Sequence, residues 1–201
     1  MVRIGVTGGI ACGKSLVGNY LEEHGVAVRD ADDIAHEVIL NGHPAYDPVV
    51  ELFGTEILDS TGEIDRRVLG EIVFSDPAKL ARLSAEIHPL VRIEWTEWLQ
   101  AQADQGQAGA AVIIPLLYEV GLSEGWDAVI CVASQPVVQI ERLIERGLIE
   151  EDARRRLGVQ MSTDEKMRRA DYVIVNNSTR ASVREQVMRT MKNIMENNHA
   201  G

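Results

Sequence analysis

The sequence predicts an α/β protein built on a five-stranded parallel sheet that is wound on both faces by helices. Two short segments, 110–114 and 127–132, consist almost entirely of apolar residues, which is typical of strands covered on both faces. Along the chain, five short expected strands alternate with helical patterns, and this alternation favours a parallel sheet. The expected strands are 2–7, 26–30, 110–114, 127–132 and 171–175.

A phosphate-binding pattern follows the first expected strand. The run Gly8-Gly9-Ile10-Ala11-Cys12-Gly13-Lys14-Ser15 fits G-x-x-x-x-G-K-[ST], and a helix is expected over 15–24. Its glycines let backbone N–H groups approach a polyphosphate at the positive end of the helix dipole. Lys14 is expected to reach the β- and γ-phosphates, and the Ser15 hydroxyl to bind Mg²⁺. A strand-to-helix turn that binds nothing is the alternative, but such a turn does not require Gly-Lys-Ser. The pattern indicates a P-loop NTPase fold.

Acidic residues end the second expected strand, in the run Asp30-Ala31-Asp32-Asp33. Ligands of open α/β sheets bind at this end of the strands, and Asp32 and Asp33 also fall in the first turn of the next helix. The run is therefore either a helix cap with solvated charges, or it supplies a carboxylate that faces the γ-phosphate as a base or Mg²⁺ partner.

From 34 to about 103 the pattern is helical and is broken by turns rather than strands, which predicts a helical insertion between strands two and three. Within it, His88 and Arg92 lie one helical turn apart. A histidine in a helix is more often structural than functional, so the pattern leaves a ligand role for His88 open.

Basic residues are concentrated late in the chain. Eight of the twenty lysines and arginines fall between Arg142 and Arg169, a span with a balance of +2 in a chain of net charge -11. Arg142 and Arg146 are spaced to share one helical face and to offer two guanidinium groups to phosphate oxygens. The negative net charge of the whole chain argues against a nucleic-acid partner.

Other features bound the setting. The two cysteines form no metal-binding or disulfide pattern, which implies a reducing compartment. The chain enters its first strand at once, without room for a signal peptide, and no apolar run is long enough to span a membrane. We therefore expect a cytoplasmic protein without a membrane partner.

The chain lacks the Asn-Lys-x-Asp run of GTPase switches and the Ser-Gly-Gly-Gln signature of transporter ATPases. What remains is a small kinase with a helical acceptor lobe and an arginine-bearing lid, which would close over the transferring phosphoryl group and exclude water.

Further motifs carry a specific resemblance. After the phosphate loop and the Asp30-Ala31-Asp32 run come, in order, Phe53-Gly54, Asp65-Arg66, His88-Pro89-Leu90-Val91, Pro115-Leu116-Leu117-Tyr118-Glu119 and Ala170-Asp171-Tyr172-Val173-Ile174-x-Asn176. From Ile4 to about Asn177 the chain resembles the dephospho-CoA kinases.

The resemblance implies ATP-dependent phosphorylation of the ribose 3′-hydroxyl of dephospho-CoA, the last step of coenzyme A synthesis, with ATP and Mg²⁺ as cofactors. It implies a core (about 1–33, 104–139 and 170–201), an acceptor-binding insertion (about 34–103), a lid (about 140–169), and a monomer or small homo-oligomer. Asp32 matches the general base, and Lys14, Arg142 and Arg146 match catalytic positions. The remaining positions are Gly8 to Leu16 (including Leu16 itself), Asn176 and Asn177 for the nucleotide, and His88, Arg92, Leu116, Tyr118 and Glu119, besides Asp32, for the acceptor.

Two alternatives stay open. A nucleoside or nucleotide monophosphate kinase would share the fold and loop but take a smaller acceptor. A nucleotide-responsive binding protein would hydrolyse ATP slowly, move its basic lid as a signal and have no phosphoryl acceptor.

Overall fold

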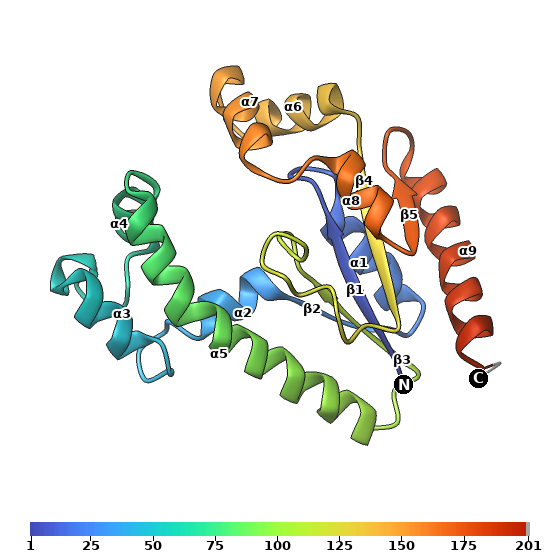
Figure 1. Ribbon diagram of the computed structural model, residues 1–201, viewed down its shortest axis with the longest axis horizontal. Coiled ribbons are helices and arrows are strands. Elements are labelled where there is room, and N and C mark those ends of the chain that lie inside the picture. Colours follow the sequence, from blue (N-terminus) through green and yellow to red (C-terminus); the bar gives the residue numbers. More distant parts are fainter. Residues whose placement is uncertain (200–201) are drawn as a thin grey trace. The chain divides into compact units, whose positions relative to one another are not determined.

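The computed structural model describes residues 1–199 and contains the five-stranded sheet that the sequence predicts (Figure 1). Its strand order is β2-β3-β1-β4-β5. The pairs β1–β3, β1–β4 and β4–β5 are parallel. The strands are β1 (Val2–Gly8), β2 (Ala27–Asp30), β3 (Gly109–Ile113), β4 (Ala128–Ala133) and β5 (Tyr172–Val175).

The described helices occupy the stretches with helical pattern. They are α1 (Lys14–Glu23), α2 (Ala31–Glu37), α3 (Tyr46–Phe53), a 3₁₀ turn (Thr55–Ile57), α4 (Arg66–Phe74), α5 (Pro77–Asp104), α6 (Pro136–Glu145), α7 (Glu150–Val159), α8 (Thr163–Arg169) and α9 (Arg180–His199). Within residues 1–199 no helix combines the length and the apolar character needed to cross a membrane.

The chain folds as two compact units. The first joins residues 1–29 to the chain from 101 onward, and the second comprises residues 30–100. The role of the second unit as an acceptor lobe stays a prediction at this point.

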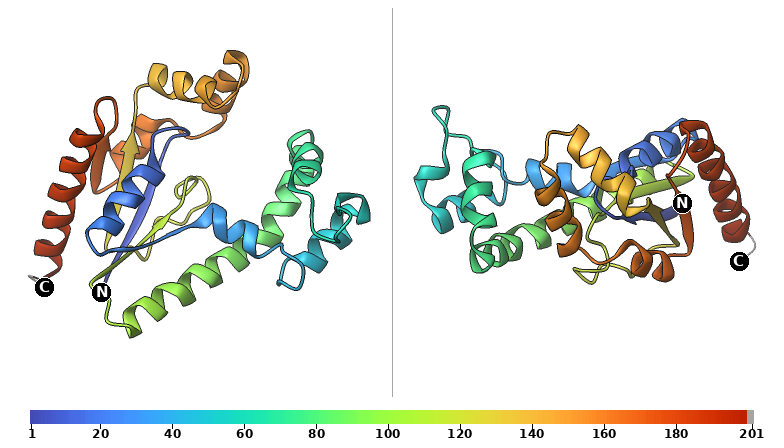
Figure 2. Two further views of the ribbon diagram at one scale, coloured as in Figure 1. Left: turned by 180° about the vertical axis from the view of Figure 1, so that it is seen from behind. Right: turned by 90° about the horizontal axis from the view of Figure 1, so that it is seen from above.

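One face of the sheet in the first unit carries α1 and α9. Strand side chains alternate between faces, and Ile4 and Val6 of β1 point into a cluster with Val17 of α1 and Val187 of α9. All four side chains are fully buried. The view from above shows the two helices side by side (Figure 2). This cluster is the main hydrophobic core of the unit.

The other face of β1 is lined differently, because Gly5 and Thr7, which are both buried, lie on it. A side chain at Gly5 would come within 3.1 Å of both Leu117 and Trp126. The Thr7 hydroxyl donates a hydrogen bond to the Pro115 carbonyl over 3.2 Å. Helix α8 packs on this face against β1 and β4.

The parallel register brings three strand ends to one edge of the sheet. Gly8 of β1 lies opposite Val132 of β4, and Ala133 lies opposite Val175 of β5. The loop after β1, Ser134 after β4 and Asn176 after β5 therefore lie at the same edge. This register places the phosphate loop beside side chains that follow it by more than a hundred residues.

In the second unit, aspartates cap the starts of α2 and α4. Asp30 Oδ1 accepts from the Asp32 amide at the start of α2, and Asp65 Oδ1 accepts from the Arg67 and Val68 amides at the start of α4. Between α3 and α4 the structure has only one isolated antiparallel bridge, Leu58 to Ile64, so the described unit is helical as predicted.

Candidate active site

The phosphate loop runs from Gly8 to Gly13, and α1 begins at Lys14. Gly13 has φ 93°, a left-handed conformation that favours glycine. A β-carbon at this position would lie 2.2 Å from Asn176 Nδ2, closer than atoms can approach. Gly13 is therefore required both for the turn into α1 and for the contact with the end of β5.

Lys14 reaches back across the loop. Its Nζ donates hydrogen bonds to the carbonyls of Gly8, over 3.2 Å, and Gly9, over 3.0 Å. These bonds hold the ammonium group at the loop, which is where the sequence predicts its charge to be needed.

The next three carbonyls of the loop accept hydrogen bonds from side chains outside it. Gln139 Nε2 donates to Ile10 O over 2.6 Å, and an Arg142 Nη donates to Ala11 O over 3.1 Å. Asn176 Nδ2 donates to Cys12 O over 2.8 Å. Each donor comes from a segment that follows β4 or β5.

These bonds decide the electrostatics of the loop. A carbonyl that points outward removes its negative end from the space where an anion binds, while the first amides of α1 have no carbonyl partner within their helix. Ala11, with φ 56°, adopts a left-handed conformation at this turn despite its side chain. The shape of the loop is therefore suited to binding an anion.

Arg142 and Ser134 extend the support. The Arg142 guanidinium also donates to Ser134 Oγ over 3.1 Å and to the Asn176 backbone carbonyl over 3.0 Å. Ser134 is buried, and its hydroxyl donates to the same Asn176 carbonyl over 2.8 Å. Hydrogen bonds therefore join the ends of β4 and β5 next to the loop.

The two arginines expected on one face have different surroundings. Arg142 is half-buried against the loop, whereas Arg146, at the end of α6, is exposed. The catalytic role of both stays a prediction, and the contacts of Arg142 add a second role for it, which is to support the loop.

The remaining predicted nucleotide residues lie at the same edge. Ser15 is exposed in the first turn of α1, and Leu16 packs partly into the core cluster. Asn177 Oδ1 accepts a hydrogen bond from the Gln135 amide over 2.7 Å, which ties the loop after β5 to the start of α6.

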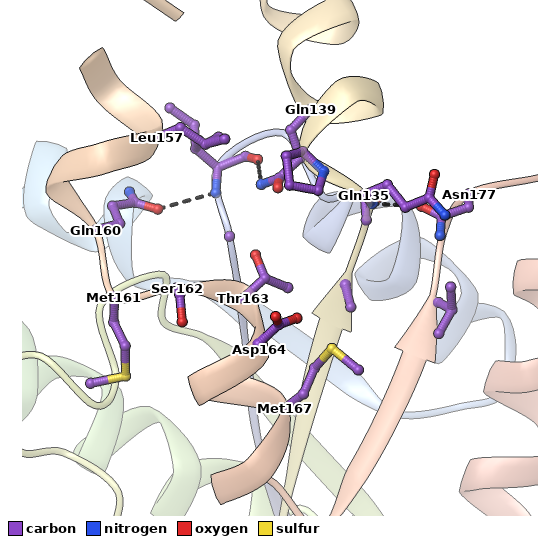
Figure 3. Close-up of a pocket in the computed structure, with 16 residues that line it drawn as sticks. Gln135, Gln139, Leu157, Gln160, Met161, Ser162, Thr163, Asp164, Met167 and Asn177 are labelled. Atoms are coloured by element: carbon purple, nitrogen blue, oxygen red, sulfur yellow. Dashed lines mark hydrogen bonds between the residues drawn. The ribbon is translucent and has the colours of Figure 1, made fainter. Parts of the chain in front are cut away.

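A cavity of about 360 Å³ adjoins the phosphate loop at Gly9 and Ile10 (Figure 3). Met161, Met167 and Leu157 make part of its wall apolar. None of the described residues that line it is a lysine or an arginine, so it lacks the positive charge that a triphosphate requires. The phosphates are instead expected beside Lys14.

The motif after β3 is mostly engaged within the protein. Glu119 pairs with Lys166 Nζ over 2.8 Å, and Lys166, which is fully buried on α8, also donates to the Pro115 carbonyl over 2.6 Å. Tyr118 lies under the Arg169 guanidinium, and burial raises the pKa of its hydroxyl to about 12. Leu116 is exposed. Roles of these residues toward an acceptor stay predictions.

Asp32 belongs to the second unit and is exposed in the first turn of α2. One helical turn later, His36 Nε2 contacts an Arg66 Nη from the start of α4. Burial and the Arg66 charge lower the pKa of His36, against the opposite influence of Asp32 and Asp33. His36 is therefore biased toward its neutral form close to the predicted base.

His88 and Arg92 lie four residues apart on α5, and both are exposed. Partial desolvation lowers the pKa of His88. Both side chains are accessible to a ligand of the second unit.

Four residues of this arrangement were not predicted as site residues: Ser134, Gln139, Gln160 and Lys166. Gln139 and Lys166 are polar residues at buried helical positions, a signal that the sequence carries only once the buried faces of α6 and α8 are known. Ser134 lies just before α6, and no sequence motif marks it as a contact of the loop. Gln160 contacts the loop from 150 residues away, which no local pattern indicates.

The fold and the loop together define the class of protein. A parallel sheet carries the sequence Gly-x-x-x-x-Gly-Lys-Ser after its central strand, a helical unit after β2 and arginine-bearing helices after β4. These are the parts of a P-loop kinase.

Comparison with known proteins identifies the family. The model of the dephospho-CoA kinase family matches residues 2–192, and a dephospho-CoA kinase of Bacillus cereus is 42% identical over 193 residues, covering 96% of each chain. The crystal structure of a Thermus thermophilus protein superimposes with a TM-score of 0.82 at 32% identity, over 96% of each chain. The structure of a dephospho-CoA kinase from Campylobacter jejuni superimposes with a TM-score of 0.71 at 28% sequence identity, over 98% of each chain. The chain belongs to the dephospho-CoA kinase family.

The buried ion pair gives a prediction about stability. Replacing Glu119 by Gln leaves the Lys166 ammonium buried without a charged partner, and we expect the free energy of unfolding to fall by about 3 kcal/mol. Glu150→Gln is the control, because Glu150 pairs with Arg154 on the exposed side of α7 and should cost less than about 1 kcal/mol. Urea unfolding of both variants measures the difference; equal costs would contradict the importance of burial.

Proposed function

We propose that the protein transfers the γ-phosphoryl group of ATP to the 3′-hydroxyl of the ribose of dephospho-CoA, giving coenzyme A and ADP. The observation that carries this proposal is a phosphate loop whose carbonyls are turned outward, in a chain that belongs to the dephospho-CoA kinase family. Phosphoryl transfer depends chiefly on positioning and on charge stabilisation, which such a loop supplies.

In this proposal Lys14 and the loop amides other than that of Ile10, which donates to Gln160, bind the β- and γ-phosphates. Arg146, exposed at the end of α6, offsets the charge that spreads over the γ-phosphoryl oxygens. Asn177 lies beside the adenine. Arg142 acts from the outer side of the loop, where it maintains the turn at Ala11.

Asp32 accepts the proton of the attacking 3′-hydroxyl. Its exposed position in the first turn of α2 leaves the carboxylate accessible to an acceptor. His88, Arg92 and Leu116 are proposed contacts of the acceptor. Tyr118 and Glu119 act on it indirectly, by fixing the segment after β3.

Mg²⁺ fits the residues at the loop. Among the described residues no three acidic, histidine or cysteine side chains gather into a metal site. Mg²⁺ bound to ATP takes most of its ligands from phosphates and water and needs only one or two from the protein. The exposed Ser15 hydroxyl at the start of α1 would hold it, and the bound ion would neutralise phosphate charge.

A cytoplasmic location is part of the proposal. Both cysteines are free and buried, and burial raises the pKa of the Cys131 thiol to about 12. Two unpaired thiols fit a reducing compartment.

An acceptor panel tests the function. We expect ADP release from ATP and Mg²⁺ to be stimulated strongly by dephospho-CoA, with a 3′-phosphorylated product, and not by adenosine, AMP or dTMP. Stimulation by a nucleoside or nucleotide instead would leave the kinase class intact and refute the acceptor. Tight ATP binding without stimulation by any of them would favour the nucleotide-responsive binding protein.

The base assignment has its own test. Asp32→Asn should lower kcat by at least about 100-fold while the affinity for ATP stays nearly constant, because the variant loses proton acceptance and no phosphate contact. Asp33→Asn, one residue further along the same exposed turn, is the matched control and should retain most activity. Full turnover by Asp32→Asn would refute the role.

A further inference from the structure

Both backbone groups of Ile10, in the phosphate loop, are bonded by glutamines from the lid and the segment that leads into it. Gln139 Nε2 donates to Ile10 O over 2.6 Å, and Gln160 Oε1 accepts from Ile10 N over 3.1 Å; Figure 3 draws the two bonds as dashed lines. Gln139 belongs to α6, and Gln160 directly follows α7. The two glutamines therefore join both ends of the α6–α7 helix pair to one residue of the loop.

The chemistry of these contacts fixes the orientation of each amide. A backbone carbonyl needs the NH₂ end of one glutamine, and a backbone N–H needs the oxygen end of the other. Gln139 is only 2% exposed, so its side chain is held inside the protein, where it faces the loop. Loss of either bond would leave a half-buried loop group without its protein partner, which costs free energy.

Apolar contacts join the same parts. Ala11 of the loop is buried in a cluster with Leu143 of α6 and Ala153 of α7, and Ile10 packs against this cluster. The loop thus contributes side chains to the core of the α6–α7 pair. It cannot change shape without disturbing that core.

Side chains of α6 and α8 also lie close to the backbone of the loop at Gly9. A β-carbon on Gly9 would lie 2.6 Å from Gln139 Nε2 and 2.7 Å from Thr163 Oγ1. The backbone of the loop therefore lies directly against α6 and the start of α8, with no space for a side chain between them.

We propose that Gln139 and Gln160 are positioning residues for nucleotide binding, which hold the Ile10–Ala11 turn in its anion-binding shape and couple it to the helices of the lid. This proposal rests on the proposed function in one respect, that nucleotide phosphates bind at the loop. Neither glutamine needs to touch the nucleotide. Each acts through the peptide groups of Ile10.

The opposite polarity of the two bonds provides the experiment. Gln160→Leu removes the acceptor for the Ile10 amide and should weaken ADP binding about tenfold. Gln160→Glu restores an acceptor and, measured in high salt that screens its added negative charge, should recover most of that loss. At Gln139 the same Gln-to-Glu change replaces the donor by a carboxylate that faces a carbonyl, so Gln139→Glu should weaken ADP binding at least about tenfold, as should Gln139→Leu.

ADP affinity by titration calorimetry, KM for both substrates and the thermal unfolding midpoint are measured for each variant. The exposed Gln105→Leu serves as a control for loss of a glutamine elsewhere. The KM for ATP should rise with the loss of ADP affinity, whereas the KM for dephospho-CoA should change less than twofold. If Gln139→Glu does not fold, the comparison of Gln160→Leu with Gln160→Glu tests the proposal by itself.

The proposal is overturned if the leucine variants unfold at lower temperature but bind ADP as the parent protein does, because the bonds would then be structural only. It is also overturned if Gln160→Glu fails to recover the affinity lost in Gln160→Leu. Failure of the proposed function gives a different result, in which the parent protein binds no ADP or binds it without phosphorylating dephospho-CoA.

Discussion

The structure depends most on the outward hydrogen bonds of the phosphate-loop carbonyls. A loop that binds a triphosphate must present amides and not carbonyls to it, and a short glycine-containing turn has no intrinsic reason to prefer that arrangement. Here Gln139, Arg142 and Asn176 bind three successive carbonyls, and Lys14 binds the two before them. Gln139 and Arg142 thereby help to set the charge pattern of the site without needing to contact the ligand.

The parallel sheet makes this support possible. Because β1, β4 and β5 end at one edge, residues distant in sequence reach the same few atoms. The second face is stabilised by another polar element, the buried Lys166, which joins α8 to the segment after β3 through Glu119 and the Pro115 carbonyl. In a chain of net charge -11, hydrogen bonds thus hold the charged groups of Lys14 and Arg142 at the loop.

Much of the fold was predictable because strands and helices leave local patterns. The five strands and the loop at Gly8 to Ser15 follow from apolar runs and a short motif, and the structure confirms them. The side-chain partners of the loop were not predictable. Gln160 and Ile10 meet only through the tertiary arrangement of α6 and α7, which no spacing encodes. Likewise, two arginines at helical spacing share a face in principle, but the end of α6 exposes Arg146 and leaves Arg142 against the loop.

The most direct measurement of the central claim is a pair of crystal structures, one of the free protein and one with ADP bound. If the loop is formed in advance, the carbonyls of Ile10, Ala11 and Cys12 keep their side-chain donors in both, and the loop backbone moves by less than about 1 Å. A free structure in which any of these carbonyls points into the phosphate site, and turns outward only with ADP, would contradict the claim.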